Sequence, residues 1–248
     1  MAEWFHELSD DLWLRPDEDG DEEARFVRRA LRLRRRHRVL DAPCGAGRLA
    51  IHLALAGCVV TCLDIRPQFV GRARRRFRAE GVSGRFAVCD MRETDWRDEF
   101  DGIYNWGGSF GYFDDAGNAD VIACYARALR PGGRLLIEQP NREHILRDFR
   151  HEVTTEKRVS RNRWNRSRER VESRYFVRGV HRAQDRSSMR LYTPGQMCVL
   201  FEHAGLRVEW VYGDLHGSRY SRSGQKMIVV GRKEGPANTY EATPGQGK

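Results

Sequence analysis

The stretch VLDAPCGAGRLAIHLA, residues 39–54, constrains the fold of this chain more than any other. It runs from apolar residues through an acid and two glycines into a helical pattern, so it predicts a strand, a tight turn and a helix. Glycines in such a turn let the backbone approach a ligand closely. The loop at residues 41–47 is therefore the first place to expect a binding site.

Strand-like and helix-like segments alternate along the chain. The β-rich runs are residues 38–42, 58–65, 85–91, 100–106 and 133–140, and the helical patterns are residues 48–57, 67–81 and 118–133. Strands that alternate with helices of this length predict a parallel sheet with helices on both faces. With 248 residues, of which 40% are hydrophobic, the chain can form one sizeable α/β domain with a small insertion.

Polar residues stand at the carboxyl ends of the predicted strands, where ligands bind in open α/β sheets. They are Asp41, Asp64, Asp90, Asn105 and Glu138. Asp64, at the end of the second strand, can accept hydrogen bonds from the two hydroxyls of a ribose, which indicates an adenosine-like ligand. Asp41 places a negative charge in the glycine loop, where it would repel a pyrophosphate. The loop therefore suits a cationic or zwitterionic ligand.

Five segments between residues 39 and 137 resemble, in the same order, the motifs of class I (Rossmann-like) S-adenosylmethionine-dependent methyltransferases. They are VLDAPCGAGR, VTCLDI, CDMRE, FDGIYNWGGSFGYF and LRPGGRLLIE. The resemblance implies a seven-stranded, mostly parallel sheet whose last strand is antiparallel, with residues 206–214 and 225–233 as strands six and seven. It also implies S-adenosyl-L-methionine (SAM) as cofactor and S-adenosyl-L-homocysteine as product.

The same resemblance implies a set of cofactor contacts, carried over by position. The residues are Asp41, Gly45, Gly47, Asp64, Ile65, Asp90, Met91 and Asn105. Asp64 would hold the ribose hydroxyls, and Asp90 would accept from the adenine amino group. Asn105 or its carbonyl would face the methionine ammonium, and the two glycines would give clearance for the methionine portion.

The stretch NWGGSFGYF, after the fourth predicted strand, bears on the methyl acceptor. It lacks the Asn/Asp-Pro-Pro-Tyr/Phe pattern of enzymes that methylate amino nitrogens of bases or glutamine amides. Its aromatic residues would instead wall a pocket for a small organic acceptor, methylated on nitrogen or oxygen. The predicted substrate-binding residues are Trp106, Phe110, Tyr112 and Arg190. The segments MRLYTPGQMCVLFEHAGL and VYGDLHGS are similar to a subgroup that acts on amines or sugars in secondary metabolism.

No motif identifies a catalytic base. A hydroxyl acceptor usually needs one, whereas an amine needs only to be neutral when it reacts. The candidates are His216, Tyr192 and Tyr112. We expect residues 1–36 to form a lid, with Trp4, Phe5 and Trp13 closing over the site, and then a helix from about residue 21.

Residues 141–192 interrupt the methyltransferase-like core, which comprises residues 37–140 and 193–233. They alternate charged with apolar residues, which predicts a small antiparallel sheet. The resemblance implies that this sheet covers the active site. Residues 142–190 contain 15 Lys and Arg and 7 Asp and Glu, a difference of +8 within a net charge of +9. This surface either faces solvent, which we favour, or binds an acidic partner. The basic segment therefore leaves methylation of RNA or protein open. SAM binding without methyl transfer also stays open, because the sequence secures no catalytic residue.

The patterns that the sequence lacks bear on its cellular context. No apolar run approaches the ~18 residues of a membrane helix, and the acidic, amphipathic start is unlike a signal peptide. The six cysteines form no CxxC or Cys/His cluster, so neither a metal site nor a disulfide framework is predicted. We expect a cytoplasmic monomer or homodimer with no membrane association and a disordered tail at residues 234–248.

Overall fold

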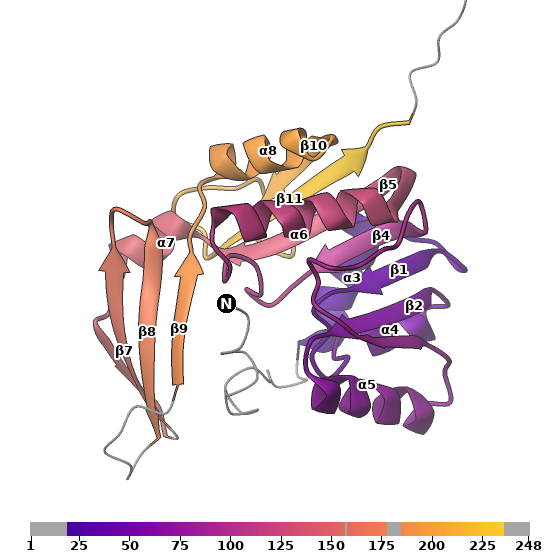
Figure 1. Ribbon diagram of the computed structural model, residues 1–248, viewed down its shortest axis with the longest axis horizontal. Helices are drawn as coiled ribbons and strands as arrows, with labels where there is room; N and C mark the ends of the chain where they lie inside the picture. The colour runs from indigo at the N-terminus through magenta and orange to yellow at the C-terminus, as the bar shows by residue number, and fades with distance from the viewer. Residues whose placement is uncertain (1–18, 157, 178–184, 236–248) are drawn as a thin grey trace, which may run out of the picture.

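The computed structural model describes residues 19–156, 158–177 and 185–235. Its framework is a seven-stranded sheet flanked by helices and a four-stranded sheet that stands beside it (Figure 1). In the part of the chain so described, no helix is long and apolar enough to cross a membrane.

The large sheet combines the strands β1 (Arg38–Asp41), β2 (Val59–Asp64), β3 (Arg85–Val88), β4 (Phe100–Asn105), β5 (Leu129–Pro140), β10 (Leu206–Tyr212) and β11 (Lys226–Lys233). Their order is β10-β11-β5-β4-β1-β2-β3. The first five run parallel, and β11 is antiparallel to both β5 and β10. The strand order reverses between β1 and β4, so a ligand site is expected where the carboxyl ends of these two strands meet.

The helices are α3 (Gly20–Ala30), α4 (Ala50–Leu55), α5 (Pro67–Ala79), α6 (Asp115–Ala128), α7 (Arg142–Arg147) and α8 (Pro194–His203). Local sequence signals fix several of their ends. Asp114 caps α6, because its carboxylate accepts from the Gly117 N–H at 2.9 Å. Thr193 and Gln196 form a capping box at the start of α8.

Alternate residues of the buried strands pack against opposite helical layers. In β1, Val39 lies in the apolar cluster formed with α3, α4 and α5, whereas its neighbour Leu40 lies in the cluster formed with α6 and α8. In β11, Ile228 lies in the first of these clusters and Val229 in the second. Both faces of the sheet are therefore covered, and only the strand ends are open to a ligand.

The small sheet contains β6 (Glu152–Thr154), β7 (Arg158–Asn165), β8 (Arg170–Val177) and β9 (Asp185–Arg190), in that order and all antiparallel. Glu169, in the turn before β8, anchors it to the core by accepting from Arg142 at 2.6 Å, Arg190 at 2.5 Å and Gln196 at 2.9 Å. Burial alone would raise the pKa of Glu169, but these hydrogen bonds lower it to about 2. The anchor is therefore ionised at any pH near neutrality.

The predicted fold class is confirmed: a seven-stranded, mostly parallel sheet with an antiparallel strand, flanking helices and a small antiparallel sheet. Two strand boundaries differ from those predicted by three residues or more. β5 begins at Leu129 rather than at residue 133, because Pro131 cannot continue α6. β3 ends at Val88, so Asp90 lies beyond the strand. The predicted lid residues Trp4, Phe5 and Trp13, and residues 236–248 of the predicted tail, lie outside the described residues.

Candidate active site

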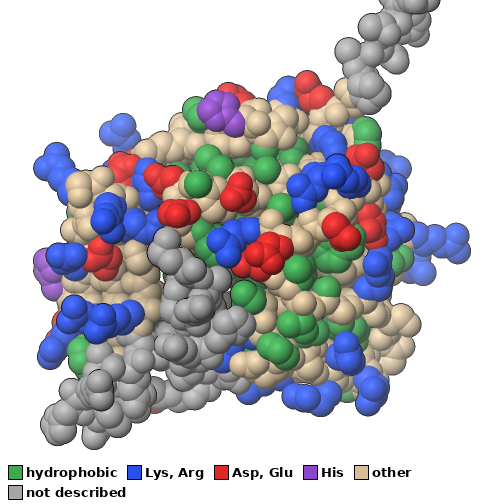
Figure 2. Space-filling view, in the orientation of Figure 1, with side chains coloured by type: hydrophobic (Ala, Val, Ile, Leu, Met, Phe, Trp, Pro, Cys, Tyr) green, Lys and Arg blue, Asp and Glu red, His purple; other side chains and the backbone are tan. Residues whose placement is uncertain are grey.

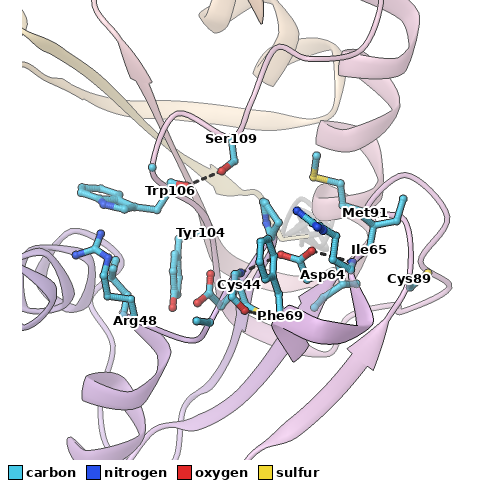
Figure 3. A pocket seen from close by; sticks show the side chains of 18 of the residues that line it. Cys44, Arg48, Asp64, Ile65, Phe69, Cys89, Met91, Tyr104, Trp106 and Ser109 are labelled. Carbon is cyan, nitrogen blue, oxygen red and sulfur yellow. Dashed lines mark hydrogen bonds between the residues drawn. The ribbon is translucent and has the colours of Figure 1, made fainter. Parts of the chain in front are cut away.

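A cavity of about 420 Å³ opens at the carboxyl ends of β1, β2 and β4 (Figure 3). Its size lies within the range of small-molecule and cofactor pockets. Six of the eight predicted cofactor residues line it, namely Asp41, Gly45, Asp64, Ile65, Asp90 and Met91. The structure therefore brings together residues that are up to 50 positions apart in the sequence, at the point where the strand order reverses.

Asp64 ties the glycine loop to the end of β2. It is 5% exposed, and its two carboxylate oxygens accept from the N–H groups of Gly45 and Arg66, each at 2.9 Å. Burial raises the pKa of Asp64, and these hydrogen bonds oppose that rise. Each carboxylate oxygen can accept more than one hydrogen bond, so Asp64 can also receive ligand hydroxyls.

The two glycines of the loop have different roles. Gly45 has φ +51°, and a Cβ placed there would meet nothing within 4 Å, so this residue leaves open space beside the cavity. Gly47 has φ +74°, and its Cβ would lie 3.0 Å from the Cβ of Ala73 in α5. Gly47 therefore allows α5 to pack closely against the loop. The expectation that it gives clearance to a ligand needs correction, since it does not line the cavity.

Asp41 lies in the cavity wall at the end of β1 with 3% of its surface exposed. Burial raises its pKa from 3.8 to about 8, against the opposing effects of the Tyr104 hydroxyl and Arg48. The guanidinium of Arg48 is itself paired with Glu23 of α3. Asp41 is thus a buried carboxyl without a full counter-charge, which suits a cationic ligand group.

The far side of the cavity is formed by the segment after β3. Asp90 lines the cavity, but its carboxylate is held by Arg92, whose Nε and Nη2 donate at 3.0 and 2.6 Å. Burial would raise the pKa of Asp90, yet the Arg92 hydrogen bonds lower it overall. Asp90 therefore stays ionised, and it can accept from a ligand only with lone pairs that Arg92 leaves open.

The loop after β4 forms the remaining wall, with Trp106, Ser109, Tyr112 and Phe113 at the cavity. Ser109 donates to the Trp106 carbonyl at 3.0 Å, as Figure 3 shows. Glu138, at the end of β5, accepts from the Gly108 N–H at 2.8 Å. These bonds fix the backbone of residues 106–109 at the cavity wall.

The family comparison identifies this region. Residues 39–133 match the family model described as a methyltransferase domain. This stretch is a methyltransferase domain. The predicted Rossmann-like methyltransferase assignment is confirmed for these residues, and all the residues that line the cavity lie within them.

Known proteins similar to this chain include both sequence relatives and solved structures. A ubiquinone biosynthesis O-methyltransferase of Xylella fastidiosa is 29% identical over 74% of this chain, which spans only 64% of that relative's length. The CcbJ methyltransferase of Streptomyces caelestis superposes with a TM-score of 0.78 at 16% identity, over 94% of this chain and 98% of that one. CalS10, an amino pentose methyltransferase from Micromonospora echinaspora, gives a TM-score of 0.59 at 22% identity, over 88% and 92% of the two chains.

Arg170 connects the small sheet to the wall of the methyltransferase domain. Its guanidinium donates to the carbonyls of Gly111, Tyr112 and Phe113 at 3.0, 3.1 and 2.8 Å. It also donates to the hydroxyl and carbonyl of Ser188 in β9 at 2.8 and 2.6 Å. The insertion therefore sets the position of two aromatic residues that line the cavity. No sequence motif marks Arg170, and sequence reasoning missed it.

Three predicted residues do not lie at the cavity of the methyltransferase domain. Phe110 is fully buried in the apolar core against Tyr192. The Tyr192 hydroxyl lies between Asn118 at 3.0 Å and Asp115 at 3.4 Å, and burial raises its pKa to about 12. Arg190 is paired with Asp115 and Glu169. The expected roles in substrate binding and base catalysis need correction, because these side chains hold the insertion and the core together.

Asn105 and His216 also lie outside the cavity wall. Asn105 is fully buried, and its amide donates to the Tyr125 hydroxyl at 3.3 Å. His216 is exposed on the loop between β10 and β11, where its backbone N–H donates to the Asp214 carboxylate at 2.9 Å. Neither position supports direct contact with a ligand. Tyr112 is therefore the one of the three candidate bases that lines the cavity.

Proposed function

We propose that this protein transfers a methyl group from SAM to a nitrogen or oxygen of a small organic acceptor. The observation that carries the proposal is the cavity of the methyltransferase domain, which has the buried carboxyl groups of Asp41 and Asp64 on one side and the aromatic loop at residues 106–113 on the other. The residues fit the cofactor: open space beside Gly45, a buried carboxyl for a cation at Asp41, and Asp64 for ribose hydroxyls.

Each side chain then has an assigned contact. Asp41 would face the charged methionine end, and Ile65 and Met91 would pack against the adenine. Trp106 and Tyr112 would flank the acceptor. When bound, SAM supplies an activated methyl on a sulfonium, whose carbon–sulfur bond breaks as the acceptor lone pair attacks from the opposite side. The protein contributes mainly positioning, which in ideal cases is equivalent to effective molarities of about 10⁵ M or more.

The acceptor must lose a proton for the product to be neutral. An amine can react unaided once it is deprotonated, whereas a hydroxyl needs a base. We assign that base to Tyr112, since it is the candidate that lines the cavity. The aromatic wall favours a small acceptor, and the amino pentose in the description of CalS10 favours one of secondary metabolism. We further propose that the protein is a cytoplasmic monomer or homodimer and that residues 141–192 lie above the pocket.

One screen tests the proposal. The protein is incubated with methyl-labelled SAM and separate pools of amines, phenols, sugars and RNA. We expect label in a small-molecule pool. Label in RNA alone would favour the RNA alternative, and SAM binding with no transfer to any pool would favour a SAM-binding protein without activity.

Removing Asp64 should weaken SAM binding severely. Asp64→Ala loses the acceptor of two ribose hydroxyls and also frees the N–H of Gly45. Hydrogen bonds to a charged group contribute roughly 1.5–3 kcal/mol each, so we expect a Kd about 100-fold higher by calorimetry. Asp120→Ala, an exposed site on α6 with the same charge change, is the control. Equal affinity in Asp64→Ala and wild type would refute the assignment.

Removing Arg170 should separate acceptor use from SAM binding. Arg170→Met loses five hydrogen bonds, three of them to the loop at residues 111–113. With an acceptor found in the screen, we expect kcat/KM to fall by about 10-fold or more while the SAM Kd changes by less than about 2-fold. Arg168→Met, an exposed position two residues away, should leave both unchanged. A matching loss of SAM affinity in Arg170→Met would contradict the positioning role.

A further inference from the structure

Three arginines form one row across the small sheet. In the strand register Arg161 of β7 lies opposite Arg174 of β8, and Arg174 lies opposite Arg186 of β9. Directly opposed residues point to the same side of a sheet. All three are exposed, so the row places three positive charges together on one face.

The residues that the structure describes leave most of the charge of this row uncompensated. Like charges in directly opposed positions destabilise a sheet. Arg161 has an exposed ion pair with Glu152 at 3.0 Å, whereas Arg174 and Arg186 have no ion pair or side-chain hydrogen bond within the described ranges. The neighbouring row differs, because there Arg163 is paired with Glu172 at 2.6 Å. The row of Arg161, Arg174 and Arg186 is therefore suited to an anion that is not part of the sheet.

The row lies on the same side of the sheet as Arg170, which contacts the cavity wall. Arg170 and Arg174 are four residues apart on β8, and residues at even spacing share a face of a strand. At about 3.3 Å per residue, the row is roughly 13 Å along the strand from Arg170, which holds the loop at residues 111–113. The three arginines are among the residues that line a hollow of about 650 Å³ at this part of the sheet. Figure 2 shows Lys and Arg side chains gathered over the sheet on the face in view.

We propose that the row of Arg161, Arg174 and Arg186 binds a phosphate-type oxyanion carried by the methyl acceptor. The inference rests on the proposed function, since it names the class of acceptor used at the same site. Guanidinium groups bind phosphate oxygens through paired, charge-assisted hydrogen bonds, and three neighbouring guanidiniums suit a multiply charged group. An acceptor held here by its anionic end would extend along β8 toward the wall formed by Tyr112 and Phe113.

The local character of the row favours a small anion over a nucleic acid. Nucleic-acid surfaces neutralise many phosphates in succession along a track. Here the next row carries a neutralised pair, Arg163 and Glu172, and the end of the row carries Glu152. Within the described part of β7 and β8, a neutralised pair therefore bounds the row on one side.

Binding of inorganic pyrophosphate to the full chain tests the inference. Calorimetry is run with S-adenosyl-L-homocysteine present, at an ionic strength of about 0.1 M so that distant charges are screened. The test variant is Arg174→Gln with Arg186→Gln, and the control is Arg75→Gln with Arg78→Gln, two exposed arginines of α5. Both pairs remove two positive charges. Thermal unfolding checks that each variant is folded, and a single-stranded RNA of about 20 nucleotides is titrated in parallel.

We expect one pyrophosphate site in the wild type. Its Kd should be about 10-fold or more higher in the row variant and within about 2-fold of the wild-type value in the control. Pyrophosphate should also inhibit methyl transfer competitively with the acceptor. Equal weakening in both variants, or no binding to the wild type, would overturn the inference. Tighter binding of RNA than of pyrophosphate, lost in the row variant, would overturn it in favour of a nucleic-acid surface. If the protein bound pyrophosphate at this row but did not bind S-adenosyl-L-homocysteine, the proposed function would be rejected instead.

Discussion

SAM binding should release close to one proton per protein at pH 7, and its affinity should rise with pH up to about 8. Asp41 is 3% exposed, and burial raises its pKa from 3.8 to about 8, so most of the ligand-free protein carries a protonated Asp41 at neutral pH. A cationic ligand favours the ionised carboxylate and displaces that proton. Between about pH 5 and 8, linkage predicts up to a tenfold lower Kd per pH unit.

Calorimetry at pH 7 in two buffers with different ionisation enthalpies measures the released proton directly. Asp41→Asn is the matched variant, because it keeps the shape of the side chain and cannot titrate. It should bind SAM more weakly, with the same observed enthalpy in both buffers and a flat pH profile. Identical enthalpies in the two buffers for the wild type would show that Asp41 does not exchange a proton with the ligand.

The stability of the ligand-free protein should depend on pH in the opposite direction. A carboxyl with a raised pKa binds its proton more tightly in the folded state than in the unfolded state. Its contribution to the free energy of unfolding is therefore fully present below pH 3.8 and is lost as pH rises through about 8. Asp64, whose pKa burial also raises, acts in the same direction. Asp41→Asn should therefore unfold at a higher temperature than the wild type at pH 8, even though it binds SAM less well.

Gly111→Ala should destabilise the protein by about 3 kcal/mol or more and lower its melting temperature by roughly 6–12 °C. Gly111 has φ +100°, and a Cβ there would lie 2.5 Å from the backbone oxygen of Arg190. The Arg190 N–H also donates to the Gly111 carbonyl at 2.7 Å, so the two backbones cannot separate without breaking this bond. The substitution strains the loop and pushes the insertion away from the cavity.

Gly195→Ala is the control for this effect. Gly195 lies in the first turn of α8, and a Cβ there would meet nothing within 4 Å. Alanine should leave stability unchanged or raise it by up to about 1 kcal/mol, because the unfolded chain loses conformational freedom. Thermal and urea unfolding of both variants measure the difference. A melting temperature for Gly111→Ala equal to that of the wild type would contradict the close approach of the two backbones.

Most residues on the glycine-loop side of the cavity could be predicted from the sequence, because they lie close to strand ends. Asp41, Asp64 and Met91 each lie within a few residues of a strand end, and the alternation of strands and helices determines which edge those ends share. Side-chain chemistry then suffices to propose a role for each. The fold follows from the same alternation, together with the proline and glycine signals at helix ends.

The acceptor side could not be predicted in this way, because its residues depend on distant partners. The Arg190 guanidinium could bind a substrate, but it is paired with the carboxylate of Asp115, 75 residues earlier. Gly47 looks like a ligand-facing glycine until α5 places Ala73 against it. In Tyr192 the hydroxyl is used by Asn118, 74 residues away. Residue type and spacing carry no record of such contacts.

The five hydrogen bonds of Arg170 also limit how acceptor preference can be transferred between relatives. The small sheet and the loop at residues 111–113 are linked through one guanidinium and through the backbone of Gly111 and Arg190. A chimera that exchanges only the sheet would pair a foreign guanidinium with unmatched carbonyls. Recombination or engineering should therefore move residues 107–113 and 142–192 as a single cassette.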